Sequence, residues 1–313
     1  MKGIIFGPAA SRRLGRSLGI SIVPKKVCSL DCLYCEVSKT TVCTLKRAPY
    51  VPAREVLAEF KAKYPVVREN TDVVTITGLG EPTLNSQLKE IIAGIKEVSE
   101  HPVALLTNST TLADKEVVQA LLPLDIIVPS LDAVSQDIFE SVDKPITGLR
   151  ITEIIESLVS FSHKFGGRLY LEALLVKGVN DSRDELVKFA ETAKRIRHDK
   201  VQIGTVFRPP AGEGVKSLSK DELEEARLIL EGRGLNAEIT GLFSADSAAK
   251  AASLTVKEYV EALLLARPVT ISDIATGTGI SEEDAKRLIA LIDSVQVRNY
   301  NGEVYYSRTT LLS

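Results

Sequence analysis

Apolar and polar positions alternate along most of the chain with two different periods. Short apolar or β-branched runs predict buried strands, whereas longer runs with an apolar residue at every third or fourth position predict helices. Strands are expected near residues 20, 73, 104, 126, 170 and 202, with a further strand over residues 235–240. Helices are expected between them, over residues 53–64, 88–99, 115–122, 151–165, 184–197 and 220–231. This alternation indicates an α/β fold with a parallel sheet and helices on its outside.

The C-terminal residues 255–313 follow a different pattern. Helices are expected over residues 255–266, 272–275 and 281–293. Two short strands, residues 295–300 and 303–307, flank Asn301-Gly302, which is a strong hairpin signal. Three helices and a hairpin resemble a winged helix-turn-helix. We therefore predict an α/β domain over residues 1–245, a linker over 246–254 and a small winged-helix-like domain over 255–313.

The charge of this small domain bears on its partner. Residues 253–313 carry six Lys or Arg and eight Asp or Glu. The helix that would enter a DNA groove begins with Glu282, Glu283 and Asp284, whose carboxylates would face phosphates unfavourably. Protein contact, dimerisation or a lid over the larger domain is therefore favoured over RNA or DNA binding.

Composition adds few constraints. The chain has 313 residues, is 44% hydrophobic and 26% charged, and carries a formal net charge of -2, which does not by itself suggest a nucleic-acid or membrane partner. No apolar run approaches the roughly 20 residues of a membrane span, and no secretory segment is evident, so we predict a cytoplasmic protein. The first 50 residues are basic, and Arg12, Arg13 and Arg16 form either a site for phosphate or carboxylate or a solvated loop.

Three of the four cysteines lie close together, at Cys28, Cys32 and Cys35. Thiolates are the usual ligands of iron-sulfur clusters, and three of them can bind three irons of a cubane and leave the fourth iron open. Structural zinc is an alternative, but it needs four ligands and no histidine lies nearby in the sequence. Cys43 could be a fourth ligand. A disulfide is disfavoured, because three close thiols leave one unpaired.

The Cys-x3-Cys-x2-Cys spacing, with Tyr34 before the last cysteine, resembles the signature of the radical S-adenosylmethionine (SAM) superfamily. This resemblance implies a partial (β/α)6 TIM-like barrel over residues 1–245. It also implies that Cys28, Cys32 and Cys35 hold a 4Fe-4S cluster whose open iron binds SAM. An electron from the cluster would then cleave SAM to a 5'-deoxyadenosyl radical.

Further motifs follow in the order of that superfamily. The segment Gly78-Leu79-Gly80-Glu81-Pro82 resembles its GGEP motif, which binds the SAM amino group, although Leu79 departs from the pattern. Polar residues at later strand ends match positions that contact SAM or substrate, and helix capping is the alternative role for each of them. Glu172 interrupts an apolar strand and should have a cationic or donor partner. These further candidate residues are Asn108, Ser130, Asp132, Glu172 and Asn180.

The segment around Arg12, Arg13 and Arg16 most resembles a group of uncharacterised iron-sulfur oxidoreductases that are distantly related to tRNA wyosine-base synthases. Those synthases carry a second cluster on further cysteines, and here only Cys43 is spare, so their activity is not carried over. The resemblance implies a radical SAM enzyme that acts on a small molecule, a peptide or RNA and takes electrons from a reductase or a flavodoxin-type donor. The alternative is a non-catalytic, metal-binding regulatory protein that acts through its C-terminal domain.

Overall fold

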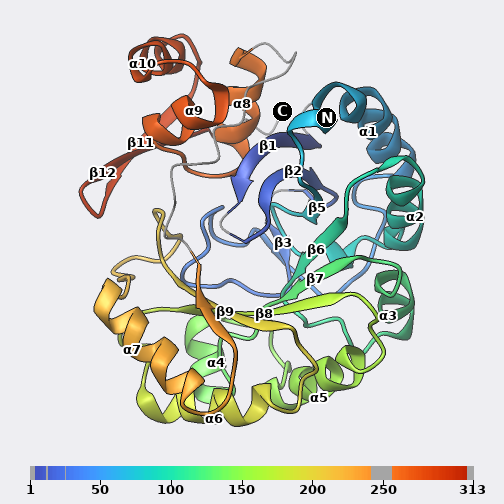
Figure 1. The fold of residues 1–313 in the computed structure, drawn as a ribbon, viewed down its shortest axis with the longest axis vertical. Coiled ribbons are helices and arrows are strands. Elements are labelled where there is room, and N and C mark those ends of the chain that lie inside the picture. Colours follow the sequence, from blue (N-terminus) through green and yellow to red (C-terminus); the bar gives the residue numbers. More distant parts are fainter. Residues whose placement is uncertain (1–3, 12, 25, 241–255, 309–313) are drawn as a thin grey trace.

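A mostly parallel sheet organises the computed structural model, which describes residues 4–11, 13–24, 26–240 and 256–308 (Figure 1). Its eight strands follow the order β1-β2-β5-β6-β7-β8-β9-β10, and each neighbouring pair is parallel except β1 with β2. The strands are β1 (Ile5–Ser11), β2 (Gly15–Ser21), β5 (Val73–Thr77), β6 (Val103–Thr107), β7 (Ile126–Pro129), β8 (Arg168–Leu175), β9 (Lys200–Thr205) and β10 (Ala237–Ile239). This α/β arrangement is consistent with a partial TIM-like core.

Helices cover the outside of this sheet (Figure 1). In α2 (Leu88–Val98), the apolar side chains of Leu88, Ile91, Ile92 and Ile95 are buried at helical spacing, which is why this segment both forms a helix and packs on the sheet. The predicted alternation of strands and helices is confirmed, with one additional short helix, α4. The helices are α1 (Ala53–Val67), α2 (Leu88–Val98), α3 (Lys115–Leu121), α4 (Gln136–Val142), α5 (Ile151–Ser162), α6 (Arg183–Ala193) and α7 (Lys220–Glu231).

The N-terminal hairpin corrects the sequence prediction. A single strand was expected near residues 20–23, whereas β2 ends at Ser21 and pairs with an antiparallel edge strand, β1. Gly7 and Pro8 lie inside β1, and both residue types are unusual within strands. An edge strand tolerates them, because one of its sides has no ladder partner. The propensity of the residues alone therefore gave no signal for β1.

The side chains that the curved sheet encloses form two layers. Near the amino ends of the strands, Val73, Ala104, Ile126 and Tyr170 form an apolar cluster, and Leu14 from the turn between β1 and β2 packs against it. The strands therefore close around apolar side chains at this end. Polar and sulfur-containing side chains occupy the opposite, carboxyl end.

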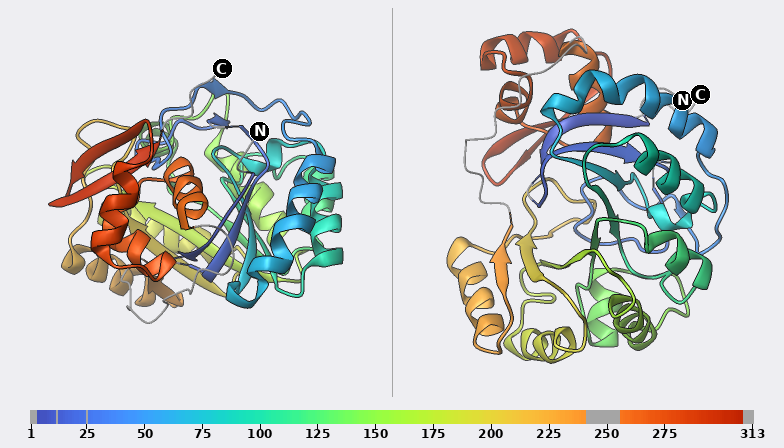
Figure 2. Two further views of the ribbon diagram at one scale, coloured as in Figure 1. Left: turned by 90° about the horizontal axis from the view of Figure 1, so that it is seen from above. Right: turned by 45° about the vertical axis from the view of Figure 1, so that its right-hand side comes forward.

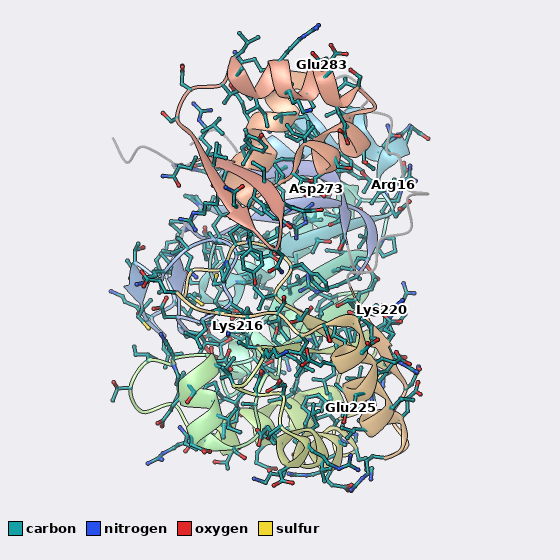
Figure 3. All side chains as sticks on the ribbon, turned by 90° about the vertical axis from the view of Figure 1, so that its left-hand side faces the viewer. Arg16, Lys216, Lys220, Glu225, Asp273 and Glu283 are labelled. Atoms are coloured by element: carbon teal, nitrogen blue, oxygen red, sulfur yellow. The ribbon has the colours of Figure 1, made fainter. Side chains whose placement is uncertain are left out.

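A separate apolar core holds the C-terminal unit, residues 256–308, together. Tyr259 donates a hydrogen bond to the carbonyl oxygen of Pro8 in β1 (2.9 Å), and Tyr305 donates one to the carbonyl oxygen of Phe207 after β9 (2.8 Å). The unit thus contacts the edge strand β1 and the segment after β9, and Figure 2 shows it beside the N-terminal strands. Figure 3 places Asp273 on the side of the unit that faces the larger body. Its elements are α8 (Val256–Ala266), α9 (Ile271–Thr278), α10 (Glu282–Ala290), β11 (Val295–Tyr300) and β12 (Glu303–Arg308).

Three further sequence expectations concern the fold. The predicted linker, residues 246–254, lies outside the described residues. Within the described ranges, none of the helices is both long and apolar enough to cross a lipid bilayer. The expected elements of the C-terminal unit are all present, three helices followed by an antiparallel hairpin.

Candidate active site

A cavity of about 230 Å³ opens at the carboxyl ends of the parallel strands. The carboxyl ends of parallel strands meet at one edge of a sheet, and this is where α/β barrels place their chemistry. The cavity brings together residues that are up to 161 positions apart in the sequence, from Arg13 to Leu174. Of the residues expected from the sequence, it is lined by Cys28, Cys32, Tyr34, Cys35, Gly78, Gly80, Glu81, Pro82, Asn108, Ser130 and Glu172.

The loop with the three cysteines is fixed by backbone hydrogen bonds from two sides. The amide of Leu33 donates to the carbonyl oxygen of Val142 (2.9 Å), which ties the loop to the end of α4. The amide of Ala211, in the segment after β9, donates to the carbonyl oxygen of Cys35 (2.9 Å). The short strand β3 (Val27–Cys28) also pairs with β4 (Val42–Cys43), so that Cys28 lies opposite the exposed Cys43. The protein backbone thus holds the loop in place.

The environment of the thiols indicates what they can bind. Burial raises the pKa of Cys28 to about 12 and raises that of Cys32 well above its ordinary value. A thiol must lose its proton to bind a metal, so these sites favour ligands that supply positive charge. Lys26, only 3% exposed, donates a hydrogen bond from Nζ to Cys35 Sγ (3.0 Å) and supplies one such charge. Three thiols with no imidazole among the lining residues form the donor set of an iron-sulfur cluster.

Glu81 is buried and held by four donors. Its Oε1 accepts hydrogen bonds from Thr83 N (3.1 Å), Thr83 Oγ1 (2.6 Å) and Thr107 Oγ1 (2.8 Å). Its Oε2 accepts one from Asn108 N (2.8 Å). Burial raises the pKa of its carboxyl group, although each of these donors lowers it. Glu81 therefore joins the ends of β5 and β6 and fixes the shape of the cavity wall.

The backbone of Gly80 lies against the short strand that carries the first cysteine. A Cβ atom on Gly80 would lie 2.0 Å from the carbonyl oxygen of Val27, which precedes that cysteine. The same oxygen accepts a hydrogen bond from Glu81 N (3.0 Å). Gly80 therefore permits close contact between the glycine-rich turn and the cysteine strand.

The polar residues at the later strand ends face the cysteine loop. Asn108 Nδ2 donates to Ser29 Oγ (3.0 Å) and lies 3.5 Å from Cys28 Sγ, so this residue contacts the loop rather than capping a helix. Tyr34 OH donates to Asp132, whose other oxygen accepts from Leu174 N (2.7 Å). Burial raises the pKa of Asp132 to about 6. Asp132 thus holds the ring of Tyr34 at the wall, although it does not itself line the cavity.

Asn180 does not reach the cavity. Its amide nitrogen donates to the carbonyl oxygens of Asp132 and Leu174 (both 2.8 Å), and its side-chain oxygen accepts from Val176 N (2.7 Å). With 1% exposure, the side chain has no face left for a ligand. The resemblance implied contact with the cofactor, whereas the structure gives Asn180 the role of a clamp between strand ends.

Two charged residues of the site, Lys26 and Asp143, gave no signal in the sequence, whereas Arg13 was one of three arginines expected either to bind phosphate or carboxylate or to lie in a solvated loop. Glu172 was expected to have a cationic or donor partner, and this partner is Arg13, whose Nε forms an ion pair with Glu172 Oε1. Asp143 accepts a hydrogen bond from Cys32 Sγ (3.2 Å), and Lys26 contacts Cys35. Arg13 and Asp143 are more than 100 residues from their partners, so only the tertiary structure brings them together. Arg12 lies outside the described residues.

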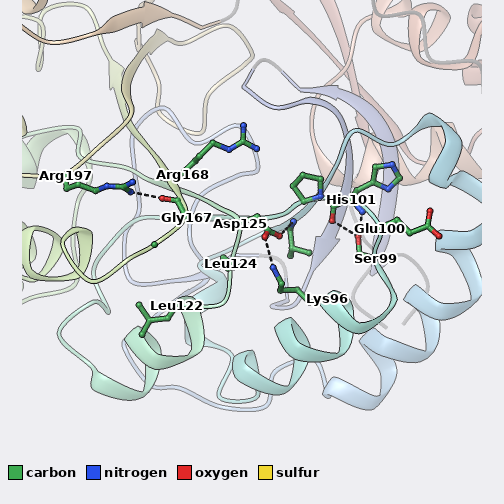
Figure 4. Close-up of a pocket in the computed structure, with 13 residues that line it drawn as sticks. Lys96, Ser99, Glu100, His101, Leu122, Leu124, Asp125, Gly167, Arg168 and Arg197 are labelled. Carbon is green, nitrogen blue, oxygen red and sulfur yellow. Dashed lines mark hydrogen bonds and ion pairs between the residues drawn. The ribbon is translucent and has the colours of Figure 1, made fainter.

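A second hollow, of about 700 Å³, lies at the amino ends of β6, β7 and β8 (Figure 4). Most of its charged groups are paired with their neighbours, whereas no hydrogen bond or ion pair joins the Arg168 side chain to a partner among the described residues. Lys96 Nζ lies 2.7 Å from Asp125 Oδ1, and Arg197 donates to the carbonyl oxygen of Gly167 (2.7 Å). No residue that the sequence marked as a site candidate lines this hollow.

Comparison with known proteins agrees with this geometry. The sequence model of the family described as the Radical SAM superfamily matches residues 22–190 of 313, more than half of the chain. A protein of Helicobacter pylori named "UPF0026 protein" is 38% identical over 231 residues, which are 73% of this chain and 74% of that protein. A Brachyspira hyodysenteriae protein named "GTPase Obg" is 33% identical over 97% of this chain, but the chain spans only 45% of its length.

The solved structures show the same fold. The structure described as a radical SAM methyltransferase from Sphaerobacter thermophilus superposes with a TM-score of 0.57 at 20% identity, over 74% of this chain and 69% of that one. At this identity the structural likeness supports only the fold. The family assignment rests on the sequence match, which covers residues around the cavity. The chain therefore belongs to the radical SAM superfamily, whose members are enzymes that use a 4Fe-4S cluster and SAM.

Proposed function

We propose that this chain reductively cleaves SAM and uses the resulting 5'-deoxyadenosyl radical to modify a substrate in the cavity. The observation that carries this proposal is that Cys28, Cys32 and Cys35 line one cavity with the turn around Glu81. When bound there, a 4Fe-4S cluster supplies the electron that cleaves the carbon-sulfur bond of SAM. The identity of the substrate is left open by this geometry.

The residues of the cavity divide into two groups. Cys28, Cys32 and Cys35 would hold the cluster, with Lys26 as a neighbouring positive charge. The turn of Gly78, Gly80, Glu81 and Pro82 would offer backbone oxygen atoms to the SAM amino group, while its carboxylate keeps the turn in shape. Tyr34, Asn108, Ser130 and, through Tyr34, Asp132 would form the remaining wall of the SAM site.

The first experiment is anaerobic. The protein is reconstituted with iron and sulfide, reduced with dithionite and given SAM, and 5'-deoxyadenosine is measured beside the variants Cys32→Ala and Cys43→Ala. We expect product from the wild type and from Cys43→Ala, and none from Cys32→Ala. A full cluster that gives no product, and whose electron paramagnetic resonance spectrum does not respond to SAM, would contradict the proposal.

We further propose that the chain divides into a partial (β/α)6 barrel, residues 1–245, a linker, and a winged-helix-like domain, residues 255–313. The domain would serve protein contact or dimerisation, or cover the barrel, because Asp273 of α9 lies 3.8 Å from Arg208 after β9. A reductase or a flavodoxin-type protein would supply electrons, in the cytoplasm. These assignments concern a chain that spans less than half of its Brachyspira relative.

RNA is the second candidate substrate. It is favoured by the basic N-terminal segment and disfavoured by the acidic start of α10, where Glu282, Glu283 and Asp284 are exposed. Electrostatic binding to RNA is strongest at low salt. If tRNA causes no retardation of the protein in a low-salt gel, RNA is rejected as a substrate and a small molecule or a peptide is left.

The non-catalytic alternative is disfavoured, because the chain belongs to a superfamily of enzymes.

A further inference from the structure

Arg13 is a charged residue of the cavity that the proposed SAM chemistry does not use. It lies in the turn between β1 and β2, at the amino ends of the strands, and its side chain nevertheless lines the cavity that opens at their carboxyl ends. Its side chain is 22% exposed. An arginine that extends through the interior of the sheet to a cavity is costly to desolvate, so its partners indicate its role.

The turn that carries Arg13 is fixed in a way that directs this residue inward. Arg16 forms an ion pair with Asp72 at the start of β5 (2.6 Å), and the backbone amide of Arg16 donates to the same carboxylate (2.7 Å). Gly15 adopts a φ of +77°, and a Cβ atom there would lie 2.9 Å from Asp72 Oδ2. Leu14 packs into the apolar cluster inside the sheet. With Arg16 held outside, Leu14 and Arg13 extend into the interior.

The guanidinium group of Arg13 is only partly satisfied. Its Nε pairs with Glu172 on β8, and Glu172 is itself held in the sheet, where its carbonyl oxygen accepts from Leu131 N (2.9 Å). Among the described residues, no hydrogen bond or ion pair joins the two terminal nitrogens of Arg13 to a partner, but burial, which lowers the pKa of Arg13, is offset by the carboxylates of Glu172 and Glu36, which raise it. A planar guanidinium that is held at Nε and free at its terminal nitrogens is oriented to bind two oxygen atoms of one anion.

We infer that Arg13 binds an oxyanion of the substrate, either a carboxylate or a phosphate. This inference rests on the proposed function, because it assigns the substrate class of the same cavity. The other cation that lines the cavity, Lys26, is already engaged with Cys35. Arg13 is therefore the cavity residue with free donors for an anion. Its position would place the anionic end of the substrate on the floor of the cavity and the rest toward the cysteines.

Paramagnetic broadening of small anions tests this inference without measuring turnover. The reconstituted and reduced protein, with S-adenosylhomocysteine in place of SAM so that no carbon-sulfur bond is cleaved, is titrated with inorganic phosphate, followed by 31P NMR, and with acetate, followed by 1H NMR. We expect saturable line broadening for at least one of the two anions. Broadening of phosphate alone indicates a phosphate substrate, and broadening of acetate alone indicates a carboxylate substrate. Arg13→Gln should weaken that binding at least about tenfold, and Arg13→Lys should retain part of it, because a lysine keeps the charge but loses the fork.

Arg195→Gln is the matched control. Arg195 pairs with Glu156 on the outer surface (2.6 Å) and is exposed, so this variant should broaden both anions as the wild type does. Equal broadening in the wild type and Arg13→Gln, or none in the wild type, would overturn the inference. Circular dichroism and the urea unfolding midpoint show whether Arg13→Gln remains folded. If it does not, Arg13→Lys is used in its place, because it also removes the guanidinium fork.

Two further measurements separate this inference from the proposed function. If Arg13→Gln weakens SAM binding and phosphate competes with SAM, then Arg13 binds SAM and the inference is wrong while the proposed function stands. If no cluster assembles, the proposed function fails. The same anions and variants can then be compared by calorimetry on the cluster-free protein, where a tenfold loss in Arg13→Gln still supports an anion site.

Discussion

The two ends of the sheet differ in how their charged groups are satisfied. The hollow at the amino ends of the strands is larger, about 700 Å³ against about 230 Å³, but most of its charges form ordinary pairs that are partly exposed. At the carboxyl ends, the cavity is smaller and is surrounded by half-buried thiols and buried carboxylates, among which burial raises the pKa of Cys28 and of Asp132. The size of a hollow is therefore a poor guide to chemistry here.

This difference follows from the architecture. Strand ends that lead into helices expose free backbone groups and polar side chains at one edge of the sheet, and long loops such as residues 22–52 can fold over that edge. At the other edge, short loops lead back into the strands, and most charged side chains there pair with a neighbouring group. The comparison predicts that matched substitutions at the two ends have unequal effects.

The largest difference is expected between two glycines. In Gly80→Ala at the cavity, the new Cβ would lie 2.0 Å from a backbone oxygen that cannot move freely, so we expect a loss of about 3 kcal/mol or more in the free energy of unfolding. In Gly166→Ala at the other hollow, no heavy atom lies within 4 Å of the new Cβ, and a change of less than about 1 kcal/mol is expected. Urea unfolding measures both, and similar losses would refute the comparison.

The second prediction concerns pH. The pKa of Asp132 is about 6 in the folded protein against an ordinary value of 3.8. Between these values the folded protein binds more protons than the unfolded chain, so stability should fall as pH rises from about 4 to about 6, and the part due to Asp132 should be about 3 kcal/mol at most. Asp132→Asn should remove this part of the slope in the cluster-free protein. The remaining slope would come from Asp143 and Glu81, whose carboxyl pKa values burial also raises. A wild-type profile that is flat over this range would contradict the prediction.

A smaller difference is expected between two glutamates. Glu81→Gln places an NH2 group where Asn108 N or the threonine donors need an acceptor, which leaves buried donors unpaired and should cost about 1–3 kcal/mol. Glu100→Gln, at the other hollow, loses only an exposed ion pair with Arg68 and should cost less than about 1 kcal/mol. Thermal or urea unfolding compares the two variants. A larger loss in Glu100→Gln would show that the network around Glu81 is not stabilising.

Substitution of two lysines should change the stability least, but the two variants should differ in the reduction potential of the cluster. Lys26→Met replaces a buried ammonium group by an apolar side chain of similar length and removes the hydrogen bond to Cys35. Because hydrogen bonds to cluster sulfurs and positive charge raise the reduction potential, Lys26→Met should lower it. Lys96→Met removes a half-exposed pair with Asp125 and should leave the potential unchanged. A potentiometric titration followed by electron paramagnetic resonance measures both variants, and equal potentials would argue against a role for Lys26.

Local sequence determined much of this protein. The alternation of strands and helices, the cysteine triplet and the turn around Glu81 each depend on residues that are close in the chain, so spacing and periodicity reveal them. The apolar context of Glu172 predicted a cationic or donor partner, and Arg13 is that partner. The edge strand β1 gave no such signal, because Gly7 and Pro8 interrupt it and only its pairing with β2 makes it a strand.

The tertiary structure alone decided which charges meet. Arg13 and Glu172 are 159 residues apart, and Cys32 and Asp143 are 111 apart. Such contacts depend on the curvature of the sheet and on the fold of the long loop, which no local pattern of residues specifies. The same holds for Asn180, which the sequence placed at the cofactor and the structure uses to join strand ends. Spacing can show that a chain carries ligands for a cluster, but burial and distance determine what surrounds them.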